Sequence, residues 1–93
     1  MANFKLEIID AVSSTVVNEL FFSAPTRNDA IKRMYVELQN SQNHPLGDGE
    51  YYAVLYRFVN GNYIKDDTAP YPAFKMEDDT FIFITDIPDQ FKS

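Results

Sequence analysis

The sequence predicts an α+β fold in which an antiparallel sheet of about five strands carries one helix packed across it, in the order ββαβββ. Three observations support this prediction. Apolar and polar side chains alternate near the N-terminus, residues 26–38 follow a capped amphipathic helix pattern, and an Asn-Gly pair separates two later alternating runs. The chain has 93 residues, so we expect residues 1–93 to form a single domain.

The first two strands are predicted from alternating runs on either side of a turn. In NFKLEIID, every second residue from Phe4 to Ile8 is apolar and the residues between them are mostly charged. In TVVNELFFS, Val16, Leu20 and Phe22 share one side. The intervening DAVSS has the composition of a turn, so the two runs are expected to form an N-terminal hairpin.

The helix is predicted from its cap and its apolar stripe. Thr26 is a suitable N-cap whose hydroxyl can accept from the amide of Asp29, and the Asp29 side chain can reach back. The residues at helical spacing are Ala30, Ile31, Met34, Tyr35 and Leu38. The charged residues Arg27, Lys32, Arg33 and Glu37 are expected to face water.

A second hairpin is predicted from Asn60-Gly61, because a two-residue type I′ turn needs positive φ at both positions. The predicted register pairs Val59 with Asn62 and continues to Tyr56 with Lys65. Alternation then places on one face Tyr52, Val54, Tyr56, Phe58 and Tyr63. The opposite face receives Ala53, Leu55, Val59 and Ile64, together with Arg57.

The C-terminal part predicts one more strand. Pro70 and Pro72 argue against a central strand in TAPYPAF, so this segment is interpreted as a stiff connector. A turn at residues 77–79 precedes the run TFIFIT, and residues 87–93 are expected to form a short closing turn. Because Phe81 and Ile82 begin two apolar faces of this run, the final strand is predicted to be central and covered on both sides.

The charge balance restricts the class of partner. The formal net charge is −6, and residues 48–93 carry nine acidic against four basic side chains. Nucleic acid and anionic membrane surfaces are therefore not expected to bind directly, since both need clustered Lys and Arg. The chain has no cysteine, no signal peptide pattern and no apolar run long enough for a membrane helix, so a cytoplasmic protein is expected.

No catalytic or cofactor motif is found in the sequence. His44 is the only histidine, and Ser41 and Asp48 lie near it, but triad residues normally come from separate elements. P-loop, dinucleotide, zinc and EF-hand patterns are absent, so no enzyme activity, cofactor or metal is predicted. The paired carboxylates are interpreted either as solvated turns or as a docking surface for a basic partner, with calcium binding as a further alternative.

The aromatic face is the most informative feature, because one helix can cover only one face of a sheet. The alternatives are that this face is the core with Arg57 outside, that the TAPYPAF segment and the C-terminal turn cover it, or that it binds a partner or a second copy. The predicted partner-binding residues are Tyr52, Tyr56, Phe58, Tyr63, Asp66, Asp67, Tyr71, Glu77, Asp78 and Asp79.

In size, acidity and lack of catalytic motifs, the chain resembles the small inhibitor proteins of phages and mobile elements, including anti-CRISPR proteins. This resemblance implies a non-enzymatic inhibitor or accessory protein that docks on the basic surface of a nucleic-acid enzyme, and it assigns no residue a role. The alternative is a structural or regulatory homo-oligomer, such as a homodimer, that pairs through its open sheet face or edge. A small-ligand or metal-binding domain with a pocket between helix and sheet is the third hypothesis.

Overall fold

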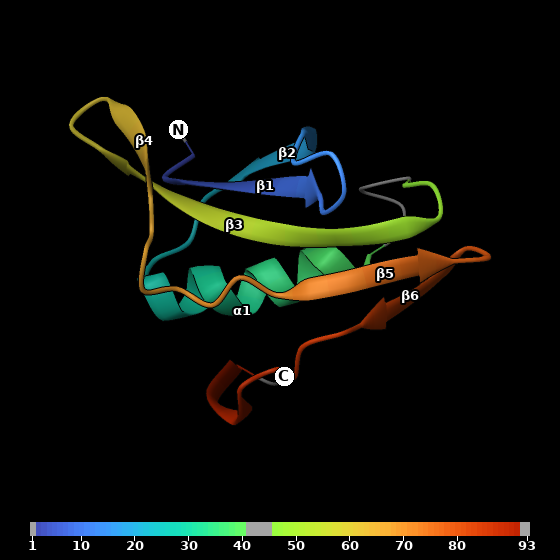
Figure 1. Ribbon diagram of the computed structural model, residues 1–93. Coiled ribbons are helices and arrows are strands. Elements are labelled where there is room, and N and C mark those ends of the chain that lie inside the picture. The colour runs from blue at the N-terminus through green and yellow to red at the C-terminus, as the bar shows by residue number, and fades with distance from the viewer. Residues whose placement is uncertain (1, 41–45, 92–93) are drawn as a thin grey trace.

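The predicted fold class is confirmed. The computed structural model describes residues 2–40 and 46–91, and within them one helix and six antiparallel strands form an open α+β fold (Figure 1). The elements are β1 (Phe4–Asp10), β2 (Val16–Phe22), α1 (Arg27–Gln39), β3 (Gly49–Val59), β4 (Asn62–Lys65), β5 (Ala73–Glu77), β6 (Thr80–Phe83) and the 3-10 turn η1 (Asp89–Phe91). The sheet order is β2-β1-β3-β5-β6, and β4 pairs with β3 outside this order.

The elements with strong local signals lie where the sequence predicts them. β1 and β2 form the N-terminal hairpin, with Leu6 opposite Leu20. The Thr26 hydroxyl accepts from the Asp29 amide at 3.1 Å and caps α1. The hydroxyl also donates to the Asp29 carboxylate at 2.9 Å, so Asp29 reaches back to the Thr26 side chain. The buried residues of α1 are Ala30, Ile31, Met34, Tyr35 and Leu38, as predicted.

The hairpin of β3 and β4 has the predicted register. Val59 lies opposite Asn62, and the pairing continues to Tyr56 opposite Lys65. Asn60 and Gly61 have φ values of 50° and 85°, the left-handed region that a two-residue type I′ turn requires. The local turn chemistry therefore fixes the register of this hairpin.

β5 is a strand that the sequence reasoning missed. Pro70 and Pro72 do keep their own segment out of the sheet, but the four residues that follow, residues 73–76, pair with the start of β3. Pro72 lies directly before β5, where its missing amide affects only the first position of the ladder, and its carbonyl accepts from the Ala53 amide at 3.0 Å. A proline therefore marks the beginning of this strand and does not exclude it.

The prediction that the final strand is central was wrong. A two-residue turn at Asp78 and Asp79 folds β6 back along the outer side of β5, so β6 is the last strand in the sheet order. Phe81 and Phe83 pack partly against the core. Ile82 and Ile84 belong to the other side, where they are 41% and 52% exposed.

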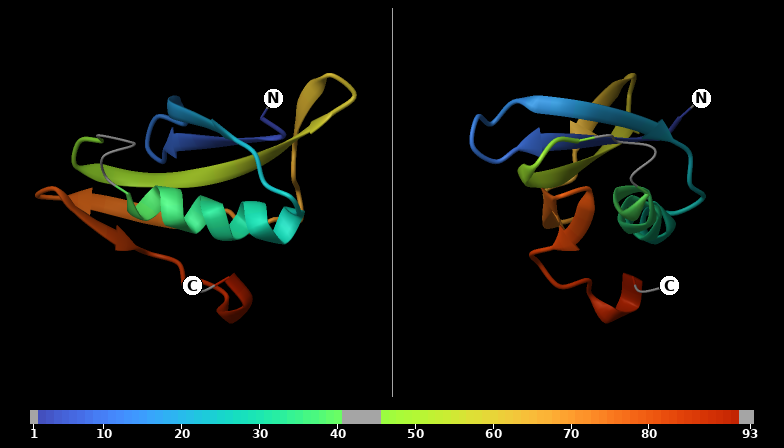
Figure 2. Two further views of the ribbon diagram at one scale, coloured as in Figure 1. Left: turned by 180° about the vertical axis from the view of Figure 1, so that it is seen from behind. Right: turned by 90° about the vertical axis from the view of Figure 1, so that its right-hand side faces the viewer.

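The sheet bends around the helix. In the right-hand view of Figure 2, β2, β1 and β3 lie above α1, and β5 and β6 turn down beside it. Side chains from α1 and from the enclosed side of the sheet form one hydrophobic cluster, which includes Leu6, Ile31, Leu38, Leu55 and Phe74. Of the described part of the chain, α1 is the only α-helix, and it is neither long nor apolar enough to span a membrane.

Candidate protein-binding surface

Within residues 2–40 and 46–91, the side of the sheet opposite α1 carries no helix, and we call it the open face. Side chains alternate along each strand, so the strand registers determine which residues belong to it. Its central residues are Lys5 and Glu7 of β1, Glu19 and Phe21 of β2, Tyr52, Val54, Tyr56 and Phe58 of β3, and Tyr63 and Lys65 of β4. Among the residues that the structure describes, no segment crosses this side, since η1 packs against α1 and residues 66–72 follow the sheet border (Figures 1 and 2).

This arrangement decides between the interpretations of the aromatic face. The helix packs on the side of Ala53 and Leu55, which are almost fully buried, so the aromatic face is not the core. Arg57 lies on the helix side of the sheet. The alternative in which the aromatic face is the core required Arg57 to lie on the side away from the core. The predicted partner-binding residues Tyr52, Tyr56, Phe58 and Tyr63 all lie on the open face, where each is half-buried by its neighbours.

The rings at one end of the open face support one another. Tyr63 packs edge-to-face against Phe21 and Phe58, with ring centroids 5.5 Å and 5.0 Å apart. The Tyr63 hydroxyl donates to the Ala2 carbonyl at 2.8 Å, which fixes the ring. Phe21 remains 56% exposed. The sequence reasoning missed Phe21. Simple alternation along the strand places its side chain on the face of the sheet opposite to that of Leu20 and Phe22.

A polar group of residues lies beside these rings. The Lys5 Nζ atom is 3.1 Å from a Glu7 carboxylate oxygen and 3.9 Å from one of Glu19, and it lies 4.4 Å from the centroid of the Tyr56 ring. Burial, followed by a hydrogen bond to Glu7 and the charges of Glu7 and Glu19, raises the pKa of Tyr56 to about 12. Tyr56 therefore stays a neutral hydrogen-bond donor at any physiological pH. The sequence reasoning missed these three charged residues, because only the strand order of the fold brings β2, β1 and β3 together.

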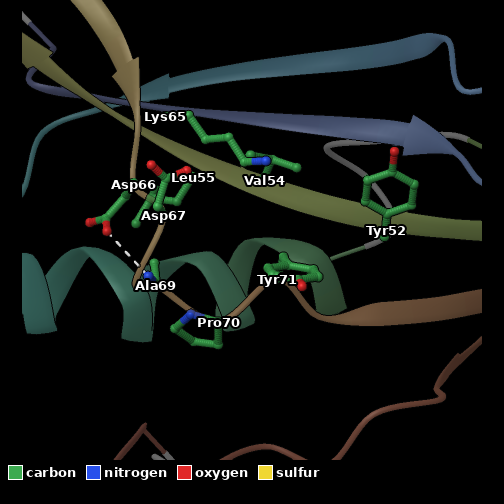
Figure 3. A pocket seen from close by; sticks show the side chains of 9 residues that line it. All are labelled: Tyr52, Val54, Leu55, Lys65, Asp66, Asp67, Ala69, Pro70 and Tyr71. Atoms are coloured by element: carbon green, nitrogen blue, oxygen red, sulfur yellow. Dashed lines mark hydrogen bonds between the residues drawn. The ribbon is translucent and has the colours of Figure 1, made fainter.

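A pocket of about 390 Å³ opens at the border of the open face (Figure 3). It forms because the far edge of β3 pairs with β5 at one end and with β4 at the other, and the connecting chain leaves the sheet between them. The pocket is lined by Tyr52, Val54, Leu55, Lys65, Asp66, Asp67, Ala69, Pro70 and Tyr71. It does not lie between helix and sheet, where the small-ligand hypothesis placed a pocket.

The pocket has an apolar floor and a polar rim. Leu55 and Ala69 are 1% and 5% exposed, whereas Tyr71 is 65% exposed. Lys65 and Asp67 are exposed and carry opposite charges. A side chain with an apolar body and a polar tip fits this distribution. Two further predicted partner-binding residues, Asp67 and Tyr71, therefore lie beside Tyr52 at one recess.

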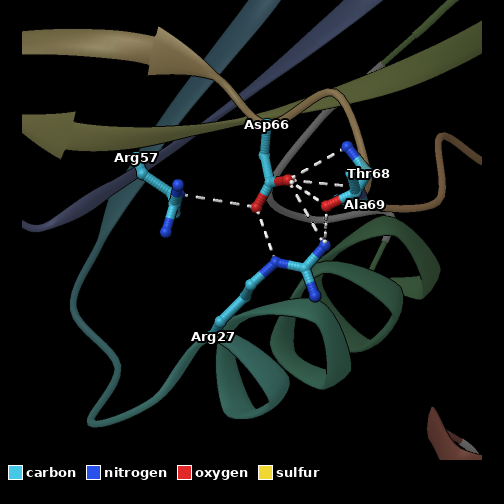
Figure 4. A network of polar contacts seen from close by, with 5 residues as sticks. All are labelled: Arg27, Arg57, Asp66, Thr68 and Ala69. Atoms are coloured by element: carbon cyan, nitrogen blue, oxygen red, sulfur yellow. Dashed lines mark hydrogen bonds and ion pairs between the residues drawn. The ribbon is translucent and has the colours of Figure 1, made fainter.

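Asp66 is the exception among the predicted partner-binding residues, because its carboxylate is occupied inside the protein (Figure 4). It accepts from Arg27 Nε at 2.8 Å, from the Thr68 hydroxyl at 3.2 Å and from the Ala69 amide at 3.1 Å. Arg57 Nε lies 3.6 Å away. The hydrogen bond from Arg27 is the main reason that the pKa of Asp66 is lowered, although burial opposes it. Asp66 attaches the connection between β4 and β5 to the start of α1, and Arg27 is not simply a water-facing residue.

The remaining predicted residues gather at one end of the molecule. Glu77, Asp78 and Asp79 lie at the exposed turn between β5 and β6, next to the first residues of β3. There the Asp78 amide donates to the Asp48 carboxylate at 3.1 Å. We call the residues Asp48, Glu50, Glu77, Asp78 and Asp79 the acidic end. Tertiary structure thus combines two acidic segments that are well separated in the sequence.

Among residues 2–40 and 46–91, no group of three or more His, Cys, Asp or Glu side chains is arranged to hold a metal ion. Ser41 and His44, considered above with Asp48, lie outside the described residues.

Comparison with known proteins gives no family for this chain. No family model, curated protein or solved structure matches it. Its function is therefore inferred from the open face, the pocket and the acidic end.

Proposed function

We propose that this protein is a non-enzymatic protein-binding module that docks on a partner through its open face. The observation that carries the proposal is the lack of any described segment over this face, although it holds a cluster of aromatic side chains. Phe21, at 56% exposure, is the most accessible of these rings. Aromatic residues that are held in place by their neighbours lose little conformational entropy on binding, and they are frequent at the energetic centres of interfaces.

The charge distribution favours a partner with a basic surface. The acidic end concentrates five carboxylates around a single Lys75, which is bound to Glu77 at 3.3 Å. Such a concentration attracts positive surfaces over about 10 Å at moderate salt and orients the encounter. Burial of the aromatic rings then supplies most of the affinity. The pocket beside Tyr52 offers a recess for one side chain of the partner.

A nucleic-acid enzyme is the class of partner that we propose, with this protein as its inhibitor or accessory factor. Such enzymes carry Lys and Arg side chains along the track that holds phosphates, and carboxylates can occupy the same positions. The net charge of −6 on a 93-residue chain supports this pairing. Because the negative charge around the aromatic face repels phosphates, we do not expect this face to bind nucleic-acid bases.

The test is capture of the partner from the native host on the immobilised protein, with matched variants. Phe21→Ser removes a ring from the open face, and Val36→Ser removes a side chain of similar exposure, 53%, from α1 on the opposite side. We expect one protein with a basic surface to be retained by the wild type and by Val36→Ser, and to be lost with Phe21→Ser. Circular dichroism should show that both variants are folded.

Salt separates the two contributions to binding. Raising the salt from about 50 mM to about 1 M should slow association strongly and leave part of the affinity, since screening acts on the charges and not on the rings. Equal capture by Phe21→Ser and wild type, or binding that is unchanged across this salt range, would contradict the proposal.

A further inference from the structure

The sequence pattern of the final strand, β6, does not agree with its position in an isolated chain. Its sequence, TFIFIT, is apolar on both sides, the pattern of a strand that is covered on both faces and flanked by two neighbours. In the part of the chain that the structure describes, its position is the outer edge of the sheet, beside β5 alone. Ile82 and Ile84 are consequently 41% and 52% exposed.

The other outer strands carry features that oppose pairing with another chain, and β6 does not. β2 has Asn18 and Glu19 at its centre and a bulge in its pairing with β1. β4 ends in the charged residue Lys65. Residues 80–85 contain no charge, proline or glycine. β6 is as short as β4, at four residues, but it has none of the charges or bulges that usually protect natural sheet edges, so its edge indicates a partner strand.

We propose that β6 pairs in antiparallel orientation with β6 of a second copy of this chain. Residues directly opposite each other in an antiparallel pair share one face of the sheet. A two-fold axis at Ile82 satisfies this condition and gives the longest overlap. It places Ile82 beside Ile82 of the second copy, and Phe81 beside Phe83 of the second copy. Thr80 then lies opposite Ile84, so each pair matches uncharged side chains.

This arrangement explains the apolar pattern on both sides of the strand. On the helix side, Phe81 and Phe83 already stack edge-to-face with centroids 4.7 Å apart, and the second copy would extend this aromatic layer. On the other side, Ile82 would lie beside Ile82 of the second copy and Ile84 beside its Thr80, so part of their exposed surface would be covered. The predicted central strand is then central in the assembly, because two sheets join into one across the axis. Such a two-fold contact is closed, so it produces a dimer and not a filament.

The flanking charges limit the strength of this contact. Continuing the register brings the turn at Asp78 and Asp79 of one copy toward Asp86 of the other. These carboxylates repel each other, so the dimer should tighten as salt rises. This salt dependence is opposite to the one expected for docking of the acidic end on a basic partner, which should weaken as salt rises. The inference uses the edge of β6 and not the aromatic side chains of the open face, so either proposal can fail without the other.

Sedimentation equilibrium tests the proposal on the full chain. We expect the 10.7 kDa chain to form a dimer within the range from about 10 μM to about 500 μM, with tighter association at about 500 mM salt than at about 50 mM. Ile82→Lys and Ile82→Glu should each weaken the dimer by about tenfold or more, since like charges would then face each other at the axis. Val59→Lys is the matched control, because Val59 is 40% exposed on a strand that takes no part.

A mixture of the two Ile82 variants gives the most specific result. An equimolar solution of Ile82→Lys and Ile82→Glu should again contain dimers, because opposite charges now meet across the axis. A merely unfolded variant could not be rescued in this way. If both Ile82 variants lose their native circular dichroism, Ile84→Glu replaces them, with Ile64→Glu as its control, since both positions are 52% exposed.

Three results would overturn the proposal. The first is a wild-type chain that remains monomeric up to about 500 μM in high salt. The second is a dimer that Ile82→Lys, Ile82→Glu and Ile84→Glu weaken no more than their controls do. The third is a dimer that becomes weaker as salt is added, because that behaviour requires attraction between charges at the contact.

Discussion

At the residue scale, Asp66 decides how the connection between β4 and β5 is held. Its side chain is 4% exposed and is bound by Arg27, whose own side chain is 36% exposed. Because Arg27 is partly in water, the pair is worth less than a fully buried one. The hydrogen bonds to Thr68 and Ala69 add to it, since they form a tight turn on the same carboxylate.

We predict that Asp66→Asn lowers the free energy of unfolding by about 2 kcal/mol, because it removes the charge that Arg27 binds. Asp67→Asn is the control at the neighbouring exposed position, and it should change stability by less than about 0.5 kcal/mol. Urea denaturation of the two variants measures the difference. Equal effects of the two substitutions would show that Asp66 is not an anchor.

The stabilisation by Asp66 should depend on pH. The folded-state pKa of this carboxyl lies below its ordinary value, chiefly through Arg27, so the contribution is complete above the unfolded-state pKa of about 3.9. It is lost as the pH falls through the lowered folded-state value. The difference in stability between wild type and Asp66→Asn should therefore be constant from about pH 5 to pH 7 and shrink below about pH 4. A difference that grows on acidification would contradict this account.

Tyr56 gives a spectroscopic test of the polar group on the open face. Its pKa of about 12 results first from burial and then from the Glu7 carboxylate. In an ultraviolet titration of the folded protein, the phenolate signal removed by Tyr56→Phe should therefore be the part that develops near pH 12. Loss of signal near pH 10, the ordinary value for tyrosine, would mean that Tyr56 is in open contact with water.

The sequence could identify these side chains as polar or aromatic, but it could not show their partners. Asp66 and Asp67 are equivalent in sequence, and only the contact with Arg27, 39 positions away, distinguishes the buried carboxylate from the exposed one. Lys5 likewise acquires its role from β2 and β3. Contacts between distant segments of a chain depend on the fold, and alternation along one strand contains no information about them.

At the scale of elements, two turns with similar backbone angles differ in their residues. Asn60 and Gly61 suit positive φ, whereas Asp78 and Asp79 adopt φ values of 51° and 63°, and Asp79 occupies the second turn position, where glycine is preferred. The acidic turn is therefore less favourable for the hairpin of β5 and β6. This difference also explains why the first hairpin was predictable in register and the second was recognised only as a turn.

We predict that Asp79→Gly raises the free energy of unfolding by about 1 kcal/mol, and that Gly61→Asp lowers it by about the same amount. At Gly61 no atom lies within 4 Å of the position that a side-chain β-carbon would take, so backbone strain alone causes the loss. Asp79→Asn is the control that removes the charge without introducing a glycine. If Asp79→Gly and Asp79→Asn stabilise equally in urea denaturation, charge repulsion and not backbone strain limits this turn.

The elements differ in how far local chemistry determines them. The helix was predictable because its cap and its apolar stripe are both local signals in the sequence. The pairing register of β3 and β4 was predictable because it follows from a two-residue turn. β5 was missed because a proline pair was treated as excluding a whole segment. The place of β6 was wrong because an apolar pattern shows that a strand is covered, and does not show whether the cover comes from the same chain.

At the scale of the whole molecule, the bent sheet separates two surfaces. Its enclosed side holds α1 and the core, and the open face remains outside with the acidic end at one extremity (Figure 2). The prediction that one helix leaves one sheet face uncovered holds for the described residues, because the 13-residue helix covers only the enclosed side. Pairing of β6 would place two open faces in one continuous sheet, so a dimer would present two docking surfaces to its partners.

Hydroxyl-radical footprinting of the protein, free and bound to its captured partner, tests the central claim most directly. The account predicts that oxidation of Phe21, Tyr56 and Tyr63 falls several-fold in the complex, while Val36 on α1 is oxidised at an unchanged rate. Protection of Val36 with no change at Phe21 would show that the partner binds the helix side, and it would contradict the assignment of the open face as the binding surface.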